Sequence, residues 1–221
     1  KKFLYYLRGV LLMKFMSDIR AKSSLLHGTA ENTGYIKKLV DCKASVDGYG
    51  EYIFNLQKVY EAIESALVKN KDNSNVKPFV TTELFRSELI KKDVEALFGD
   101  KVDSLSLLPS TEAYVDRINE MSERNPEMVI AHAYTRFLAD LFGGRTFFSL
   151  LSEKYNIKHD ALNYYSFPGI SDMKEYVMNY HNMLNSLNLS EEMCDKFIIE
   201  VNNSYIYNIA ISNELDFKLN K

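Results

Sequence analysis

The stretch that decides the fold covers residues 129–148 and reads VIAHAYTRFLADLFGGRTFF. It belongs to a segment of helical periodicity, yet it contains the adjacent glycines Gly143 and Gly144. Each glycine inside a helix costs roughly 1 kcal/mol relative to alanine, so we expect a compensating role. A glycine pair lets a helix bend and lets a flat ligand approach the backbone closely. Ala139 lies four residues before Gly143, which places both small residues on one helix face.

An acidic residue, Asp140, comes just before this glycine pair. A carboxylate in that position could hold a water molecule beside a bound ligand and pass protons to it. Tyr134 and Arg136 lie on the same predicted helix, and Tyr60 and Asn208 on others, so all four could join a buried polar network around that water. The alternative is a simple helix break that leaves Asp140 exposed, with the tyrosines serving only as core residues.

A second unusual stretch covers residues 25–32 and reads LLHGTAEN. Here His27 lies inside an amphipathic helix, with Glu31 four residues later on the same face. A neutral imidazole can bind iron through one nitrogen while a nearby carboxylate orients the ring through the other. Arg20 lies two helical turns before His27 and could reach a carboxylate on the edge of a planar ligand. The alternative is an exposed histidine with a local ion pair, and His132 is expected to pack in the core.

Helical periodicity extends over most of the chain, and strand patterns are weak. We expect one all-α domain of seven to nine helices, over residues 17–221, preceded by an N-terminal extension at residues 1–16. Ser17 and Asp18 are expected to cap the first helix, and Thr111 a later one. The predicted helices are residues 17–38, one starting at 47, 82–98, 111–124, 125–155, 172–187 and 190–217.

Composition limits the classes of function. The chain has 221 residues and a net charge of -3, so no basic field favours nucleic acid. Cys42 and Cys194 are the two cysteines, too few and too far apart for a disulfide framework or a structural zinc site. We therefore expect a reducing, cytoplasmic location. The basic, apolar start at residues 1–15 is too interrupted for a signal peptide and too short to span a bilayer, so we expect no membrane anchor.

Taken together, the two unusual stretches resemble the heme oxygenase family. Residues 131–144, AHAYTRFLADLFGG, look like the most diagnostic segment of that family, and residues 27–32, HGTAEN, look like its proximal-histidine segment. Further matches extend the resemblance over about residues 17–217. They are Asp47-Gly48 with the helix through Tyr60, Tyr114-Val115, Arg117-Ile118, Phe167-Pro168, Asn185-Ser186-Leu187 and Asn208-Ile209.

The resemblance implies a multi-helical bundle that holds heme between a proximal helix and a kinked distal helix. It implies oxidation of heme by dioxygen and reducing equivalents to biliverdin, ferrous iron and carbon monoxide, with heme as both cofactor and substrate. The electron donor would be a reductase or a protein of the ferredoxin or flavodoxin type. The implied roles are His27 as iron ligand, Glu31 as its partner, Gly143 and Gly144 over the heme, Asp140 as organiser of the distal water, Arg136, Tyr60 and Asn208 as extensions of that network, and Arg20 and Tyr134 at the heme propionates.

The sequence departs from the family pattern in the pocket. Ala139 stands where the family usually has another glycine, and Phe142 replaces a small polar residue, which should narrow the pocket. In the helix after residue 168, the family commonly offers basic residues to the propionates, whereas this chain offers Val177 and His181, with Lys174 one turn away. We expect His181 to substitute in part, and cleavage at the α-meso carbon.

Other functions remain open from the sequence alone. A heme-binding or heme-storage protein without turnover would need His27 but not the Asp140 network. A di-iron protein would need paired Glu-x-x-His motifs, which this sequence lacks, and a thiamin-degrading enzyme would need a nucleophilic cysteine near the motif residues. A purely structural helical module would leave the cost of Gly143 and Gly144 unexplained.

Overall fold

The structure is a computed structural model that describes residues 2–221, with side chains from Phe15 onward. Within these residues it contains eight α-helices and no strand, which confirms the predicted all-α class. Short 3-10 turns, among them Asn163–Tyr165, occupy several of the connections. The helices are α1 (Lys2–Glu31), α2 (Gly34–Val40), α3 (Val46–Lys69), α4 (Ser87–Phe98), α5 (Pro109–Arg124), α6 (Val129–Lys154), α7 (Met173–Asn185) and α8 (Glu191–Leu219).

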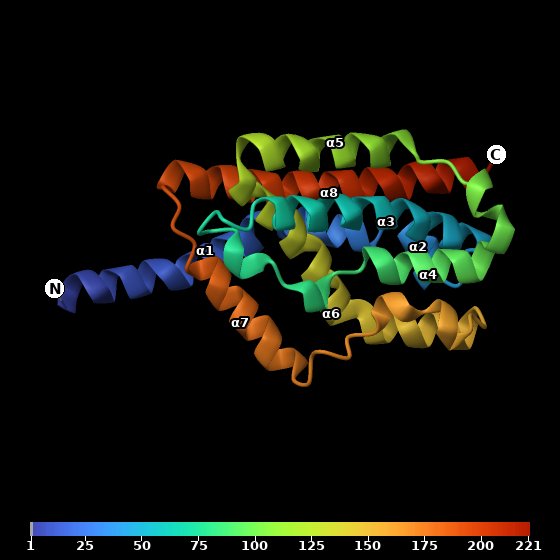
Figure 1. Cartoon of the computed structure of the whole chain (residues 1–221), viewed down its shortest axis with the longest axis horizontal. Coiled ribbons are helices and arrows are strands. Elements are labelled where there is room, and N and C mark those ends of the chain that lie inside the picture. Colours follow the sequence, from blue (N-terminus) through green and yellow to red (C-terminus); the bar gives the residue numbers. More distant parts are fainter. Residues whose placement is uncertain (1) are drawn as a thin grey trace.

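The centre of the bundle is α3, which packs against α4 and α5. Helix α8 contacts α1, α2, α5 and α6, and Figure 1 shows it running along α5 and α3. The predicted apolar face of α3 is buried, because each of its five side chains is at most 1% exposed. Those side chains are Ile53, Leu56, Tyr60, Ile63 and Leu67.

The predicted start of the first helix is wrong. Ser17 and Asp18 lie inside α1, which begins at Lys2 and continues through both residues without a break. Phe15 packs edge-on against Phe197, with ring centroids 5.4 Å apart, and Met16 is only 5% exposed. The last two residues of the predicted extension therefore pack with the bundle, while the side chains of residues 1–14 lie outside the described part, so the rest of that prediction stays open.

The predicted end of the first helix is also wrong, because α1 ends at Glu31 and a separate helix, α2, begins at Gly34. Gly34 has φ +58°, and a Cβ atom there would lie 2.7 Å from the Ser212 backbone and 2.8 Å from that of Asn213. Only glycine fits this close contact with α8 in this conformation. The chain therefore turns at Gly34, and α2 packs across α8.

Three other helix starts differ from the prediction. Residues 82–84 form a separate 3-10 turn, and α4 begins only at Ser87. Helix α5 begins at Pro109, and the Thr111 hydroxyl donates a 2.7 Å hydrogen bond to Asn55 Oδ1 instead of capping the helix. Residues 126–128 form a 3-10 turn before α6. As predicted, α6 runs through the glycine pair, and Figure 1 shows that it changes direction along its length.

Candidate active site

A cleft of about 840 Å³ opens between α1 and α6, and α8 contributes to its wall. Its size is within the range of cavities that hold small molecules and cofactors. Every site residue predicted from the sequence except Tyr60 lines it. Those residues are Arg20, His27, Glu31, Tyr134, Arg136, Ala139, Asp140, Gly143, Gly144, His181 and Asn208.

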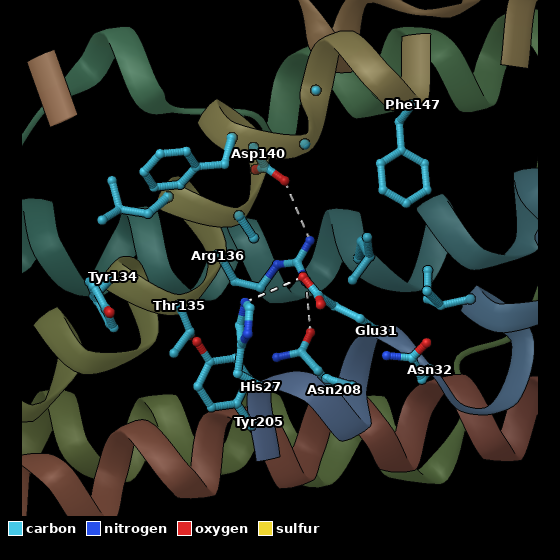
Figure 2. Close-up of a pocket in the computed structure, with 18 of the residues that line it drawn as sticks. His27, Glu31, Asn32, Tyr134, Thr135, Arg136, Asp140, Phe147, Tyr205 and Asn208 are labelled. Carbon is cyan, nitrogen blue, oxygen red and sulfur yellow. Dashed lines mark hydrogen bonds and ion pairs between the residues drawn. The ribbon is translucent and has the colours of Figure 1, made fainter. Parts of the chain in front are cut away.

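One wall of the cleft carries His27, which projects from α1. Figure 2 shows His27 and Glu31 on this side and Asp140 beyond Arg136 on the other. His27 Nε2 lies 3.4 Å from Glu31 Oε1, and the Tyr205 ring meets the imidazole edge-on at a centroid distance of 5.6 Å. The side chain of His27 is 51% exposed and lines the cleft. One ring nitrogen therefore engages a carboxylate, which leaves the other free to coordinate a metal.

The opposite wall is the small-residue face of α6. A Cβ atom at Gly143 would meet only the Phe147 ring, at 3.5 Å, so the glycine leaves open space on the cleft side. Ala139 and Phe142 on the same helix are exposed to the cleft. A planar ligand can approach the helix backbone closely at Gly143, because the glycine has no side chain there. Phe142 and Phe147 line the cleft beside it, which fits the expectation that Phe142 narrows the pocket.

The residues present fit a heme group. In the part of the chain that the structure describes, no three His, Cys, Asp or Glu side chains gather closely enough to hold a bare metal ion. A single imidazole opposite a flat wall suits an iron atom that a planar ring already holds. A di-iron carboxylate site would require such a cluster of carboxylates and histidines.

At the cleft wall, Asp140 is the centre of a largely buried polar network. Tyr60 donates a hydrogen bond to Asp140 Oδ2, and Tyr164 donates one of 2.7 Å to Oδ1. Arg136 donates to Tyr60 at 3.2 Å, to Tyr164 at 2.9 Å and to Asn208 Oδ1 at 2.9 Å. The structure thus brings Tyr60, Arg136 and Asn208 together around Asp140, as expected, and adds Tyr164. Tyr134, which was also expected to join this network, lies beside Arg20 instead. Asp140 is only 6% exposed, so the simple alternative of an exposed acid after a helix break is wrong.

Burial governs the protonation of this network. It raises the pKa of the Asp140 carboxyl above its ordinary value, while Arg136 and the hydrogen bonds from Tyr60 and Tyr164 act in the opposite direction. Burial also raises the pKa of Tyr60 and of Tyr164 well above the ordinary value. Both phenols therefore stay neutral and remain hydrogen-bond donors.

At another end of the cleft, Arg20 lies beside His181. Arg20 Nη2 is 3.4 Å from both ring nitrogens of His181, and burial, followed by the charge of Arg20, lowers the pKa of this imidazole. Tyr134 borders the same arginine. Val177 is buried away from the cleft lining, and Lys174 is exposed without lining it. The positive charge at this end therefore comes from Arg20.

Sequence reasoning missed Tyr164 and Tyr205. Tyr164 follows an irregular loop, where no helical period relates it to Asp140, and Tyr205 lies on α8 without an adjacent motif. His132, in contrast, is fully buried and packs as predicted, with Nε2 2.9 Å from Glu200 Oε1. Neither cysteine lines the cleft, so no thiol stands ready as a nucleophile there.

None of the helices in the described part of the chain has an apolar run long enough to cross a lipid bilayer. The family model for heme oxygenase matches residues 13–214. A heme oxygenase of Porphyra purpurea is 30% identical over 213 residues, which cover 96% of this chain and 90% of that protein.

Two solved structures show the same architecture. The crystal structure of heme oxygenase-1 from the cyanobacterium Synechocystis sp. PCC6803 in complex with heme matches with a TM-score of 0.88 and 27% identity, over 93% of each chain. The structure of heme oxygenase from Leptospira interrogans matches with a TM-score of 0.85 and 27% identity, over 90% of this chain and 98% of that one. This chain therefore belongs to the heme oxygenase family, whose members are heme-degrading oxidoreductases.

Proposed function

We propose that the chain binds heme in the cleft between α1 and α6 and cleaves it, with dioxygen and reducing equivalents, to biliverdin, ferrous iron and carbon monoxide. The observation that carries the proposal is the pairing of His27 on one wall with the Gly143 wall opposite, in front of the buried Asp140 network. When bound, heme supplies the iron at which dioxygen is activated and the ring that is oxidised. Every other contribution comes from the side chains around it.

His27 is the proposed iron ligand. Its contact with Glu31 supports this role, because a carboxylate beside one imidazole nitrogen fixes the orientation of the ring and leaves the other nitrogen for the metal. Tyr205 restricts the ring further by its edge-on contact. A histidine ligand of this kind would hold the iron near α1 and bring the porphyrin face toward Gly143.

Asp140 is proposed to organise water on the face of the heme opposite His27. Each carboxylate oxygen has more than one acceptor site, so Asp140 can accept hydrogen bonds from phenols and still bind water. Arg136 balances its charge and is itself held by Asn208. We propose that this arrangement delivers protons through water, while the network keeps the carboxylate itself in place.

Arg20 is proposed to hold the heme propionates. It stands at the end of the cleft near Tyr134 and His181, where a guanidinium can bind a carboxylate with two parallel hydrogen bonds. His181 and the hydroxyl of Tyr134 would add hydrogen bonds. This clamp would set the rotation of the ring in the cleft, and we expect cleavage at the α-meso carbon.

The reducing equivalents are proposed to come from a separate protein, a reductase or one of the ferredoxin or flavodoxin type. A cytoplasmic location is part of the same proposal. It is supported by Cys42 and Cys194, which are both free thiols.

One optical experiment tests the function. Hemin is added to the purified protein, the Soret band is recorded, and a reductant and air are then supplied while a ferrous globin traps carbon monoxide. We expect the Soret band to decay as biliverdin forms, with trapped carbon monoxide in equal amount. Heme that binds but survives reductant and oxygen would indicate a heme-storage protein. It would also contradict the role in proton delivery that is proposed for Asp140.

A further inference from the structure

Tyr164 occupies a central place in the polar network at the cleft wall, although it comes from a connector and not from an α-helix of the bundle. Its hydroxyl lies 2.7 Å from Asp140 Oδ1, 2.9 Å from Arg136 Nη2 and 3.0 Å from the Tyr60 hydroxyl. The side chain is buried, with the residue only 2% exposed. Tyr164 therefore contacts three of the residues to which the proposed function assigns the distal side.

The directions of the hydrogen bonds are fixed by the donors available. Arg136 can only donate, so both Tyr60 and Tyr164 accept from it. Each phenol then has one proton left to donate, and each donates it to a different oxygen of Asp140. Two parallel paths thus lead from the guanidinium through a phenol to the carboxylate. All of these hydrogen bonds can form together only when Asp140 is ionised. A protonated carboxyl would carry its own proton on one oxygen, where a phenol now donates.

The backbone around Tyr164 is held independently of that network. Asp93 on α4 is fully buried, and its Oδ2 accepts a 2.8 Å hydrogen bond from the Tyr164 backbone N–H. Its Oδ1 accepts hydrogen bonds from the backbone and the side chain of Asn163, each of 2.8 Å. These three bonds fix the 3-10 turn Asn163–Tyr165 against α4 and so determine where the phenol points.

We propose that Tyr164 is a further positioning residue of the distal site, which together with Tyr60 holds Asp140 as an oriented, ionised acceptor for water. This inference rests on the role proposed for Asp140. A carboxylate bound by one phenol can rotate about that single bond, whereas two phenols on its two oxygens leave one orientation. Tyr164 would thereby favour the acceptor state of Asp140 over the protonated state, in which it would act as a direct proton donor.

Other groups also face Asp140 and contribute to its titration. Arg136 lies on its own helix, Tyr52 and Tyr60 come from α3, Arg86 precedes α4, and Tyr165 adjoins Tyr164. The two arginines favour the ionised carboxylate, and the tyrosines are neutral. Replacing Tyr164 with phenylalanine changes none of these charges, so it isolates the effect of one hydroxyl group.

The test is a pH titration of Asp140 in the heme-free protein, followed by infrared absorption of the protonated carboxyl group. The band is assigned by its loss in Asp140→Asn. We expect the titration midpoint to move upward in Tyr164→Phe, because the ionised carboxylate loses a donor. Tyr180→Phe is the matched control: among the described residues the buried Tyr180 hydroxyl has no hydrogen-bond partner, so its removal should leave the midpoint unchanged.

The same variants are then loaded with heme, and the pH profile of biliverdin formation is measured. In Tyr164→Phe we expect unchanged heme affinity and an acid limb displaced upward in pH, parallel to the infrared midpoint. An unmoved midpoint, or a moved midpoint with an unmoved activity profile, would overturn the inference. Asp140→Ala separates the two proposals. If that variant forms biliverdin normally, the role of Asp140 fails; if it does not, an unaffected Tyr164→Phe contradicts only the role of Tyr164.

Discussion

At the scale of single residues, exposure and contacts distinguish His27 in the cleft from the core histidine, His132. The half-exposed imidazole of His27 lies between the Glu31 carboxylate and the edge of Tyr205. The buried His132 has protein atoms against both ring nitrogens, with Nδ1 3.3 Å from the Tyr114 hydroxyl and Nε2 2.9 Å from Glu200 Oε1. Neither nitrogen is accessible to a ligand, whereas His27 lines the cleft. The difference in exposure and in partners is what separates the proposed iron ligand from the core histidine.

Replacing His27 with alanine should therefore remove the proposed iron ligand while leaving the fold intact. We expect the Soret band of added hemin to lose its shift and the apparent heme affinity to fall at least tenfold, which corresponds to about 1.4 kcal/mol. Absorption spectra during a hemin titration measure both. His159→Ala is the control, because His159 is exposed and does not line the cleft. A normal Soret spectrum in His27→Ala would contradict the assignment.

Motifs in the sequence predicted many of the polar residues that line the cleft, but they gave no signal for Tyr164. His27, Asp140 and Arg136 lie in two segments whose unusual residues drew attention, and the resemblance of those segments to a known family implied their roles. Tyr164 had no such signal, because its place depends on three hydrogen bonds that Asp93 makes to a turn 70 residues away. A contact fixed by a buried carboxylate on another helix leaves no periodic trace in the sequence.

At the scale of helices, Glu200 joins three of them. From α8 it accepts hydrogen bonds from Arg117 on α5, at 2.9 Å and 2.6 Å, and lies 2.9 Å from His132 on α6. Burial acts to raise the pKa of Glu200, but the hydrogen bonds from His132 and Arg117 outweigh it and lower the pKa to about 2. A carboxyl whose pKa falls on folding stabilises the fold above its unfolded pKa and loses that contribution as pH falls through the folded value.

Glu200→Gln should thus lower the free energy of unfolding at neutral pH by about 2–3 kcal/mol, because it leaves the Arg117 charge without its buried partner. The deficit relative to the unmodified protein should shrink as pH falls from about 4.5 toward about 2. Urea unfolding at a series of pH values measures it. Glu192→Gln, in an exposed pair with Lys196, should change little at any pH. A deficit in Glu200→Gln that does not depend on pH would contradict the ionised assignment.

On α6, Gly143 lowers the stability of the helix but leaves space in the cleft for the proposed heme. Gly143 lies in a helix and has room for a methyl group in the heme-free protein, since only Phe147 would lie within 4 Å of an alanine Cβ atom there. Gly143→Ala should therefore stabilise the heme-free protein by roughly 1 kcal/mol, because alanine favours helix more than glycine does. The same methyl group would project into the cleft, where the proposed function places the heme.

We expect Gly143→Ala to raise the melting temperature of the heme-free protein while weakening heme binding and slowing biliverdin formation. Gly28→Ala is the matched control. Gly28 is also inside a helix with open space around it, but it does not line the cleft. It should give the same stabilisation with unchanged heme binding. Thermal melts and hemin titrations of both variants measure this, and equal heme affinity in the two would contradict the flat-wall role of Gly143.

The helix boundaries that sequence reasoning missed share one cause, which is contact between distant segments. The residues 17–38 were predicted as one helix because nothing in their local pattern requires a break at Gly34. The break follows from the backbone of α8 at Ser212 and Asn213, which leaves no room for a Cβ atom. Thr111 likewise bonds to Asn55 on α3 and not to its own helix. Helix identity followed from local periodicity, whereas exact ends depended on neighbours.

At the scale of the whole molecule, the cleft separates two helices that the rest of the bundle holds apart. Helix α1 packs mainly against α8 and α7, while α6 packs against α8 and α3. Between them, His27 and Gly143 face the same space without touching each other. A ligand that bound both walls would add the contact that the heme-free fold lacks.

Heme binding should accordingly stabilise the molecule and do so unevenly. A ligand that binds only the folded state adds about 2.7 kcal/mol at one hundred times its dissociation constant, so the melting temperature should rise with hemin. Hydrogen exchange should slow around His27 on α1 and around Gly143 on α6, because these backbones would pack on opposite faces of one rigid plane.

Helix α5 does not line the cleft and serves as the internal control. Those of its amides that exchange through local openings should exchange at the same rate with and without hemin. Mass spectrometry of exchange with and without hemin measures the pattern, and His27→Ala should abolish the slowing on α1. Slower exchange on α5 but not on α1 and α6 would place the heme elsewhere and contradict the cleft as its site.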